Sequence, residues 1–314
     1  SKYIKFYKCN FYASTVEKER INTSINIPPS THIIFDSCKM IYGVTYWLYA
    51  GHDYWTFRNN DFSHAGNGIY TVGSDNALND GWGSSYLLIE NNTFKHLGTA
   101  NFYHQDAHAV GVQGGRGHII QGNYIEDTGD AIVFWTGVHP MKDMIVRGNF
   151  IKDIKVKDVT GGAGIAVSGA NRDDSVGRRT GFKIYNNIIM NTGIGKTEGW
   201  QGNGIGSNNK DPVEIYNNII INPAGDGIGF GVINAPVQGA IYNNIIVNPA
   251  GRYLEIIGSP GDWSNFSCDY NLYYPATDFT TDFYFAQTID RDIHSILADP
   301  LFVDSDNGNF RLRA

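Results

Sequence analysis

Cysteine is scarce in this sequence: only Cys9, Cys38 and Cys268 occur among its 314 residues. Three cysteines cannot form a disulfide framework, and no Cys/His spacing resembles a zinc site. We therefore expect these residues to be buried thiols, as free cysteines usually are.

Long apolar runs and an excess of positive charge are missing as well. No stretch of about 18 apolar residues is present, which argues against a membrane-spanning helix. The 24 lysines and arginines are outnumbered by 31 aspartates and glutamates. The resulting net charge of −7 argues against a nucleic-acid partner, because surfaces that bind nucleic acids are usually basic. No secretory signal is visible at Ser1, so export is inferred only from the expected function.

Segments with a helical period are also rare, whereas glycine (37 residues) and aromatic residues (13%) are abundant. So many aromatic side chains do not fit a disordered chain. Glycine without a collagen-like period suits a fold with many tight turns. We therefore expect a folded protein built from short β-strands.

An internal repeat is the strongest feature of the sequence. The unit is clearest at Tyr185–Ile189, Tyr216–Ile220 and Tyr242–Ile246, which all read Tyr-Asn-Asn-Ile-Ile. Looser copies occur along the chain, and the equivalent asparagines are Asn60, Asn92, Asn123, Asn149, Asn187, Asn218, Asn244 and Asn271. Their separations are 26 to 38 residues. Asn10 and Lys39 are taken to extend the series backwards, which predicts about ten repeats.

Each repeat contains two or three short β-rich runs and cannot bury its apolar side alone, so the repeats must stack as coils. Stacking predicts an all-β, single-stranded, right-handed parallel β-helix that forms one domain over residues 1–314. The asparagines would form a structural column at a bend, where asparagine tolerates a left-handed backbone and bonds its own kind. Cys9 and Cys38 occupy equivalent places in neighbouring repeats, so they are expected to lie close together.

The end of the chain differs from the repeats. Asp299–Asp304 and Gly308–Leu312 resemble the closing segment of many secreted bacterial β-helix proteins. The resemblance implies that a segment of about 290–314 covers the last coil.

The third β-run of each repeat predicts a binding surface. Side chains alternate between the faces of a strand. The residues expected to face the core are Ile69, Val110, Ile132, Ile165, Ile205 and Ile228, followed by Thr71, Val112, Phe134, Val167, Ser207 and Phe230. Those expected to face outward are Tyr70, Gly111, Val133, Ala166, Gly206 and Gly229, followed by Val72, Gln113, Trp135, Ser168, Asn208 and Gly231. Because most of the outward residues are small, they predict a low floor that suits a flat sugar ring.

Loops that border this floor carry the remaining candidate substrate-binding residues. Together with Gln113 and Trp135 on the floor, the binding candidates are His104, His139, Arg172, Arg178, Arg179, Lys196 and Trp200. Arg178 and Arg179 are suited to gripping a carboxylate or sulfate in a bidentate manner. Each single loop charge is equally well explained as a solvated surface residue.

The densest cluster of reactive groups lies just before a floor strand. It contains Tyr103, Asp106 and His108, and Asp130 follows one coil later. In the alignment His108 and Asp130 occupy the same column, so stacking should place them about one strand spacing apart. The competing interpretation is structural: Asp130 shares its column with Asn67, Asn203 and Asp226 and would simply cap a turn.

This cluster resembles the site of the mannuronan epimerases of alginate, which are right-handed β-helices with Tyr-x-x-Asp-Pro-His and an Asp-Gly one coil later. Tyr103, Asp106 and His108 keep that spacing, with Ala107 in place of proline, and Asp130 is followed by Ala131. The resemblance covers about 30 residues plus the repeat. It implies a carbohydrate-active protein with the pectin-lyase-like fold and an epimerase- or lyase-like site.

The implied catalytic residues are therefore Tyr103, Asp106, His108 and Asp130. A lyase or epimerase removes the proton beside a uronate carboxylate, and a protonated Asp or an Arg neutralises that carboxylate. His108 or Tyr103 would act as base and acid. The expected function is that of a secreted, cell-surface or periplasmic bacterial enzyme acting on an acidic polysaccharide.

Two other functions stay open. A glycoside hydrolase would use Asp106 and Asp130 as paired carboxylates. A non-catalytic β-helix would only bind carbohydrate or serve as a surface protein. Calcium is a candidate cofactor, since Asp75, Asp80, Asp173 and Asp174 lie in loops, although no calcium-loop motif is present.

Overall fold

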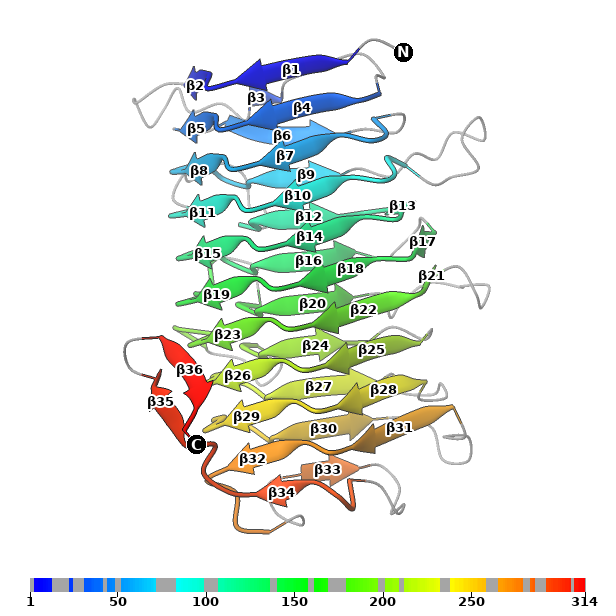
Figure 1. The fold of residues 1–314 in the computed structure, drawn as a ribbon, viewed down its shortest axis with the longest axis vertical. Helices are drawn as coiled ribbons and strands as arrows, with labels where there is room; N and C mark the ends of the chain where they lie inside the picture. Colours follow the sequence, from blue (N-terminus) through cyan, green and yellow to red (C-terminus); the bar gives the residue numbers. More distant parts are fainter. Residues whose placement is uncertain are drawn as a thin grey trace.

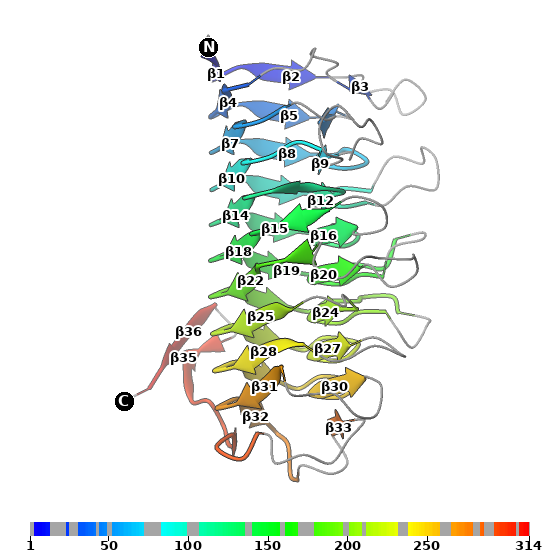
Figure 2. The same cartoon turned by 90° about the vertical axis from the view of Figure 1, so that its right-hand side faces the viewer.

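The protein is a tall stack of coils (Figure 1, Figure 2). The computed structural model describes residues 3–12, 23–24, 31–41, 44–48, 52–71, 83–98, 107–135, 140–157, 161–168, 179–196, 201–208, 212–231, 238–257, 265–278, 283–285, 292–305 and 308–313. All named elements in these ranges are strands, and no helix in them is long and apolar enough to cross a membrane. The all-β parallel β-helix predicted from the repeat is confirmed.

Three long parallel sheets run along the stack. The first sheet contains β1 (Ile4–Tyr7), β4 (Ile33–Asp36), β7 (Thr56–Arg58), β10 (Leu88–Glu90), β14 (Ile119–Gln121), β18 (Ile145–Arg147), β22 (Phe182–Tyr185), β25 (Val213–Tyr216), β28 (Gly239–Tyr242) and β31 (Phe266–Asp269). The second sheet contains β2 (Asn10–Tyr12), β5 (Lys39–Ile41), β8 (Asp61–Ser63), β11 (Thr93–Lys95), β15 (Tyr124–Glu126), β19 (Phe150–Lys152), β23 (Ile188–Met190), β26 (Ile219–Ile221), β29 (Ile245–Val247), β32 (Leu272–Tyr274) and β34 (Ile296–Leu297).

The third sheet carries the predicted floor. It contains β3 (Thr23–Ser24), β6 (Val44–Leu48), β9 (Ile69–Thr71), β12 (Val110–Val112), β16 (Ile132–Trp135), β20 (Ile165–Ser168), β24 (Ile205–Ser207), β27 (Ile228–Gly231), β30 (Leu254–Ile257) and β33 (Phe283–Phe285). A small parallel sheet of β13 (Gly115–Arg116), β17 (Met141–Lys142) and β21 (Arg179–Thr180) lies beside the stack. The hairpin of β35 (Phe302–Asp304) and β36 (Asn309–Leu312) is antiparallel.

A ladder of buried asparagines joins the first and second sheets at the bend between them. From Asn92 to Asn271, each ladder asparagine accepts two hydrogen bonds from the asparagine before it. For example, Asn187 Oδ1 accepts from the backbone N–H of Asn149 at 3.1 Å and from its Nδ2 at 2.9 Å. The Asn187 side chain in turn donates to Asn218 Oδ1 at 3.0 Å and to the backbone carbonyl of Val146 at 3.1 Å. The predicted structural column is therefore observed as a continuous hydrogen-bonded chain.

Two details of the predicted column were wrong. The left-handed backbone lies at the residue before each ladder asparagine, as at Asn186 (φ 55°) and Asn217 (φ 54°), so that the ladder side chain itself points inward. In the first two coils the column is occupied by Cys9 and Cys38, each one residue before the predicted Asn10 and Lys39. Asp61 pairs with Lys39, and the backbone N–H of Cys38 donates to Asn60 Oδ1 at 2.8 Å, so the thiols of Cys38 and Cys9 occupy the column.

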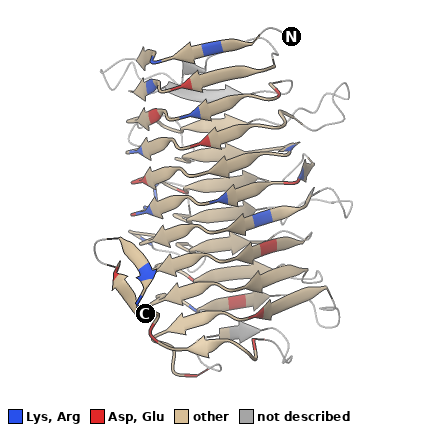
Figure 3. Cartoon of the chain, in the orientation of Figure 1, with Lys and Arg blue, Asp and Glu red and all other residues tan. Residues whose placement is uncertain are grey.

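The core inside the stack is a single apolar cluster, built from side chains that repeat in the same place in each coil. Phe35 stacks on Phe57 with ring centroids 5.1 Å apart, and Phe62 stacks on Phe94 at 4.7 Å. On the outside, charged residues of both signs are scattered over the described strands (Figure 3). Every third-sheet residue that the sequence pattern assigned to the core is buried, so the predicted core face is correct.

The C-terminal segment closes the stack in two ways. β34 pairs with β32 and so extends the second sheet at the last coil, as expected. The β35–β36 hairpin instead folds back over the outer face of the second sheet (Figure 1, Figure 2). Phe302 and Phe310 pack there against outward apolar residues that include Ile188, Ile219 and Ile245. The expectation that the whole segment covers the last coil is thus only partly correct, because the apolar outer face of earlier coils holds the hairpin.

The ladder makes a direct prediction for stability. Asn187→Ala should lower the free energy of unfolding by about 3 kcal/mol or more, because it leaves buried donors on Asn149 and a buried carbonyl on Val146 without their partners. Denaturant unfolding followed by circular dichroism measures the change. Asn10→Ala is the matched control at an exposed asparagine and should cost less than about 0.5 kcal/mol. Equal losses in the two variants would contradict the role of the ladder.

Candidate active site

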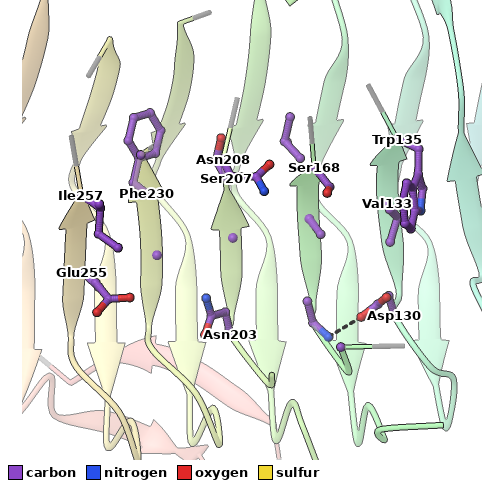
Figure 4. A pocket seen from close by; sticks show the side chains of 17 residues that line it. Asp130, Val133, Trp135, Ser168, Asn203, Ser207, Asn208, Phe230, Glu255 and Ile257 are labelled. Atoms are coloured by element: carbon purple, nitrogen blue, oxygen red, sulfur yellow. Dashed lines mark hydrogen bonds between the residues drawn. The ribbon is translucent and has the colours of Figure 1, made fainter. Parts of the chain in front are cut away.

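A groove of about 360 Å³ lies on the outer face of the third sheet and runs across β16, β20, β24, β27 and β30 (Figure 4). It is lined by Asp130, Val133, Trp135, Gly161, Ala163, Ala166, Val167, Ser168, Asn203, Gly206, Ser207, Asn208, Gly229, Phe230, Gly231, Glu255 and Ile257. Parallel pairing brings these residues together from five coils that are far apart in the sequence. The lining combines small and apolar side chains with hydroxyl, amide and carboxyl groups, as a ligand-binding site requires.

The floor of the groove follows the predicted register. Val133 pairs with Ala166, Ala166 with Gly206, and Gly206 with Gly229. Gly206 is more open than Gly229, since a Cβ atom there would meet nothing closer than Asn203 Nδ2 at 3.7 Å. Trp135 stands at one end with 42% of its surface exposed. The predicted low floor with a tryptophan beside it is therefore confirmed over these coils.

The floor is covered by a side chain at β12, two coils before β20. The ring of Tyr70 is buried and covers Gly111, where an added Cβ atom would lie 2.4 Å from Tyr70 Cδ2. Gln113 Nε2 donates to the Tyr70 hydroxyl at 2.6 Å. Gln113 thus lies on the predicted face, but outside the groove lining. Val72 lies outside the described residues.

His108 and Asp130 are neighbours, as the alignment predicted. His108 Nδ1 lies 3.7 Å from Asp130 Oδ2. The His108 side chain is 1% exposed and the Asp130 side chain 11%, so the carboxyl group lines the groove while the imidazole lies behind it. The ring of Tyr70 is nearly parallel to that of His108, with centroids 6.3 Å apart. Any group on a substrate in the groove would therefore meet Asp130 before His108.

The same column also caps the turns that lead into the third sheet. Asp130 Oδ1 accepts the backbone N–H of Ala163 at 2.6 Å (Figure 4), and Asn203 Oδ1 accepts that of Asp226 at 2.9 Å. Asn67 binds the N–H of His108 in the same way at 2.8 Å. Each side chain thus fixes the equivalent turn of the next coil. For Asp130 the capping interaction uses Oδ1, while the contact with His108 is made by Oδ2.

Glu255 is a functional candidate that the sequence alignment did not include. It pairs with Gly229 and so continues the outward column of the floor, and its carboxyl group lines the groove. The negative charge of Asp226 acts on this carboxyl group, and Asp226 Oδ1 accepts the backbone N–H of Arg252 at 2.7 Å. The Arg252 guanidinium is ion-paired with Glu255. The run Leu254-Glu255-Ile256 shows the same alternation one coil beyond Ile228, so the signal was present in the sequence.

The surroundings of Glu255 disfavour its charged form. Burial raises the pKa of this carboxyl above its ordinary value, and the negative charge of Asp226 raises it further, although Arg252 acts in the opposite direction. A carboxyl group whose neutral form is favoured in this way is better suited to donate a proton to a bound ligand. Glu255 and Asp226 therefore form a second ionisable pair at the other end of the groove from Asp130.

Most of the predicted loop residues lie outside the described residues: Tyr103, His104, Asp106, His139, Arg172, Arg178 and Trp200. Arg179 is described only as the first residue of β21. Lys196 is held away from the groove lining, because its Nζ donates to the backbone carbonyl of Ala224 at 2.9 Å.

The same limit applies to the candidate calcium ligands, since Asp75, Asp80, Asp173 and Asp174 also lie outside the described residues. Within the part of the chain that the structure describes, no group of three or more His, Cys, Asp and Glu side chains is placed to hold a metal ion. Calcium therefore stays a prediction from the sequence.

Comparison with known proteins establishes the family. The family model of the right-handed β-helix region matches residues 43–261, which is more than half of the chain, and the chain belongs to this family. No curated protein sequence matches it. An alginate lyase from Paenibacillus sp. strain FPU-7 has a similar structure, with a TM-score of 0.54, 16% identity, and coverage of 87% of this chain and 96% of the lyase.

A tailspike protein of E. coli bacteriophage HK620 is similar in the same way. Its TM-score is 0.52 with 14% identity, and the match covers 78% of this chain and 42% of the tailspike chain. The chain thus spans less than half the length of that protein. At such low identity, both similarities show a shared fold.

The raised pKa of Glu255 predicts how stability depends on pH. At a pH below the ordinary value of 4.5 the group is protonated in the folded and unfolded states alike, so it costs nothing. As the pH rises, the Glu255 carboxyl ionises in the unfolded chain before it ionises in the folded protein. The free energy of unfolding therefore falls until the pH has passed the raised folded-state pKa. Glu255→Gln removes this loss. The free energy of unfolding, measured by denaturant titration, should therefore fall more between pH 4 and pH 7 in the parent protein than in the variant. A parallel pH dependence in both proteins would contradict the assignment.

Proposed function

We propose that this chain is a carbohydrate-active enzyme that holds a stretch of polysaccharide along the groove of the third sheet and processes it there. The observation that carries the proposal is the floor itself, where Ala166, Gly206 and Gly229 form an open track across neighbouring coils. A long, flat ligand fits such a track, whereas a compact cofactor would be enclosed on more sides.

The groups around the track suit sugar rings. The exposed face of Trp135 offers a stacking surface, which is how aromatic side chains contact flat apolar faces. Ser168, Asn203 and Asn208 provide hydroxyl and amide groups for hydrogen bonds to sugar hydroxyls. The name of one structurally similar protein, an alginate lyase, agrees with a saccharide substrate.

The first reaction that we propose is that of a lyase or epimerase on a uronate-containing glycan, centred on Asp130. In this proposal Asp130, when protonated, neutralises the uronate carboxylate, which makes the neighbouring carbon acidic enough to lose its proton. His108 lies behind Asp130, so it would act on the substrate through Asp130 or after a local shift. Tyr103 and Asp106 are proposed to complete the proton transfer. Departure of the leaving oxygen gives cleavage, and reprotonation gives epimerisation.

Glycoside hydrolysis is the second candidate, and Glu255 is the observation that favours it. Asp130 and Glu255 stand four strand spacings apart, about 19 Å, which is too far for one pair of catalytic carboxyls. A hydrolase that uses the far end of the groove would therefore rely on Glu255 as acid, with Asp226 as its partner. The pair of Asp106 and Asp130 is the alternative set for hydrolysis.

Location and cofactor follow as parts of the same proposal. A polysaccharide substrate implies action outside the cytoplasm, in secreted, periplasmic or cell-surface form. Calcium is proposed as a ligand of the bordering loops, where it would help to hold an acidic sugar.

Blocking the floor tests the binding track. Gly206→Phe should weaken binding of oligosaccharides that bind the parent protein by at least about tenfold, because the new ring fills the groove without entering the core. Affinity is measured by calorimetry after a screen against plant, algal and host glycans. Gly206→Ala is the control and should retain most of the affinity, since its Cβ makes only ordinary contacts. Unchanged affinity in Gly206→Phe would refute the track.

Variants at the two ends of the groove identify the reaction. If the proposed lyase or epimerase site is correct, Asp130→Asn should lower turnover by about 10²- to 10⁴-fold while Glu255→Gln has a small effect. Absorbance of unsaturated uronate reports a lyase, and a changed sugar composition without cleavage reports an epimerase. The reverse pattern, with only new reducing ends, would establish a hydrolase at Glu255. If the protein binds a glycan of the screen but turns over none of them, it is a non-catalytic carbohydrate-binding protein.

A further inference from the structure

Two cysteines stand on adjacent coils at the N-terminal end of the asparagine column. Cys9 immediately precedes β2 and Cys38 immediately precedes β5, and these strands pair in register. The backbone N–H of Lys39 donates to the carbonyl of Cys9 at 2.9 Å, so the two cysteines stand on directly adjacent coils. In every later coil from Asn60 to Asn271 this position is an asparagine that bonds its neighbour in the next coil.

The two sulfur atoms lie in one small region. Cys38 Sγ reaches back to the first coil and lies 3.5 Å from the carbonyl oxygen of Phe6, while Cys9 Sγ lies 3.5 Å from that of Tyr7. Cys38 is 1% exposed, whereas Cys9 is only partly buried. A small reagent would therefore reach Cys9 first.

We propose that Cys9 and Cys38 are a site of oxidative cross-linking, at which a disulfide fastens the first coil to the second. Adjacent parallel strands place equivalent Cα atoms about 4.8 Å apart, which falls within the range of about 4.4 to 6.8 Å that a disulfide spans. The site is independent of the groove and of the proposed enzymatic function.

The chemistry is a two-step thiol–disulfide exchange with a small disulfide such as oxidised glutathione as the oxidant. The Cys9 thiolate attacks one sulfur of the reagent, which gives a mixed disulfide on Cys9 and releases one thiol. Cys38 then loses its proton and attacks the Cys9 sulfur, which forms the Cys9–Cys38 bond and expels the second thiol. The protein loses two hydrogen atoms, and one molecule of oxidised glutathione becomes two of reduced glutathione.

The position of the pair gives the cross-link a structural effect. In the described chain, the first coil pairs with one neighbour only, since β1 and β2 stand at the ends of their sheets. Its side chains Ile4 and Tyr7 are 48% and 53% exposed. Elements with few buried contacts open most readily. A covalent link to the second coil restricts opening of the first coil.

The cross-link is tested on the full chain in a buffer of oxidised and reduced glutathione. The expected product has lost the mass of two hydrogen atoms, and only Cys268 reacts with an alkylating reagent after denaturation. Cys38→Ser should stop at the mixed disulfide and gain one glutathionyl group on Cys9. Cys9→Ser should stay unmodified, because Cys38 is buried. Cys268→Ser is the matched control and should still form the cross-link.

Hydrogen exchange gives the second readout. Amides of residues 4–12 should exchange at least about tenfold more slowly in the oxidised protein than in the reduced protein, with little change in β26 or β29. The proposal is overturned if three cysteines remain reactive after oxidation, or if the bond forms and exchange of the first coil does not change. Neither result bears on activity at the groove.

Discussion

The hydrogen-bonded asparagine ladder is the constraint on which the rest of the structure depends. From Asn92 to Asn244, each Oδ1 accepts two donors from the preceding coil, and each Nδ2 donates to the next asparagine and to backbone carbonyls, so one side chain satisfies polar groups in several layers. These atoms are buried, and a missing partner would leave several of them without a hydrogen bond. Adjacent coils therefore cannot slip by a residue without breaking the chain of bonds.

The register that the ladder fixes also determines how the strands of the third sheet align. Because the strands of the third sheet follow in the same order, outward residues from successive coils fall in one column, and small residues in that column make a groove. The turn caps strengthen this alignment, since Asp130, Asn203 and Asp226 each bind the backbone of the coil that follows. The groove is thus a product of coil stacking, and loops are free to vary around it.

The candidate site was predictable in part. Asp130 and His108 were expected as neighbours because they share a column two residues before an apolar anchor, and the structure confirms it. The burial of His108 was not predictable, because it depends on the ring of Tyr70 and on the depth of the turn. Glu255 was predictable from the alternation in its strand, but the effect of the Asp226 charge on it was not, since the two side chains stand on different coils.

The repeat spacing and the alternation of apolar residues were enough to establish the parallel β-helix, its core face and the position of the floor, because both follow from local strand geometry. Three features required the folded coordinates: the thiols of Cys9 and Cys38 at the head of the column, the hairpin folded over the second sheet, and the separation of the groove carboxyls Asp130 and Glu255. Each depends on which side chains meet across coils. That is set by the exact register and by the packing of bulky side chains, which a one-dimensional pattern does not contain.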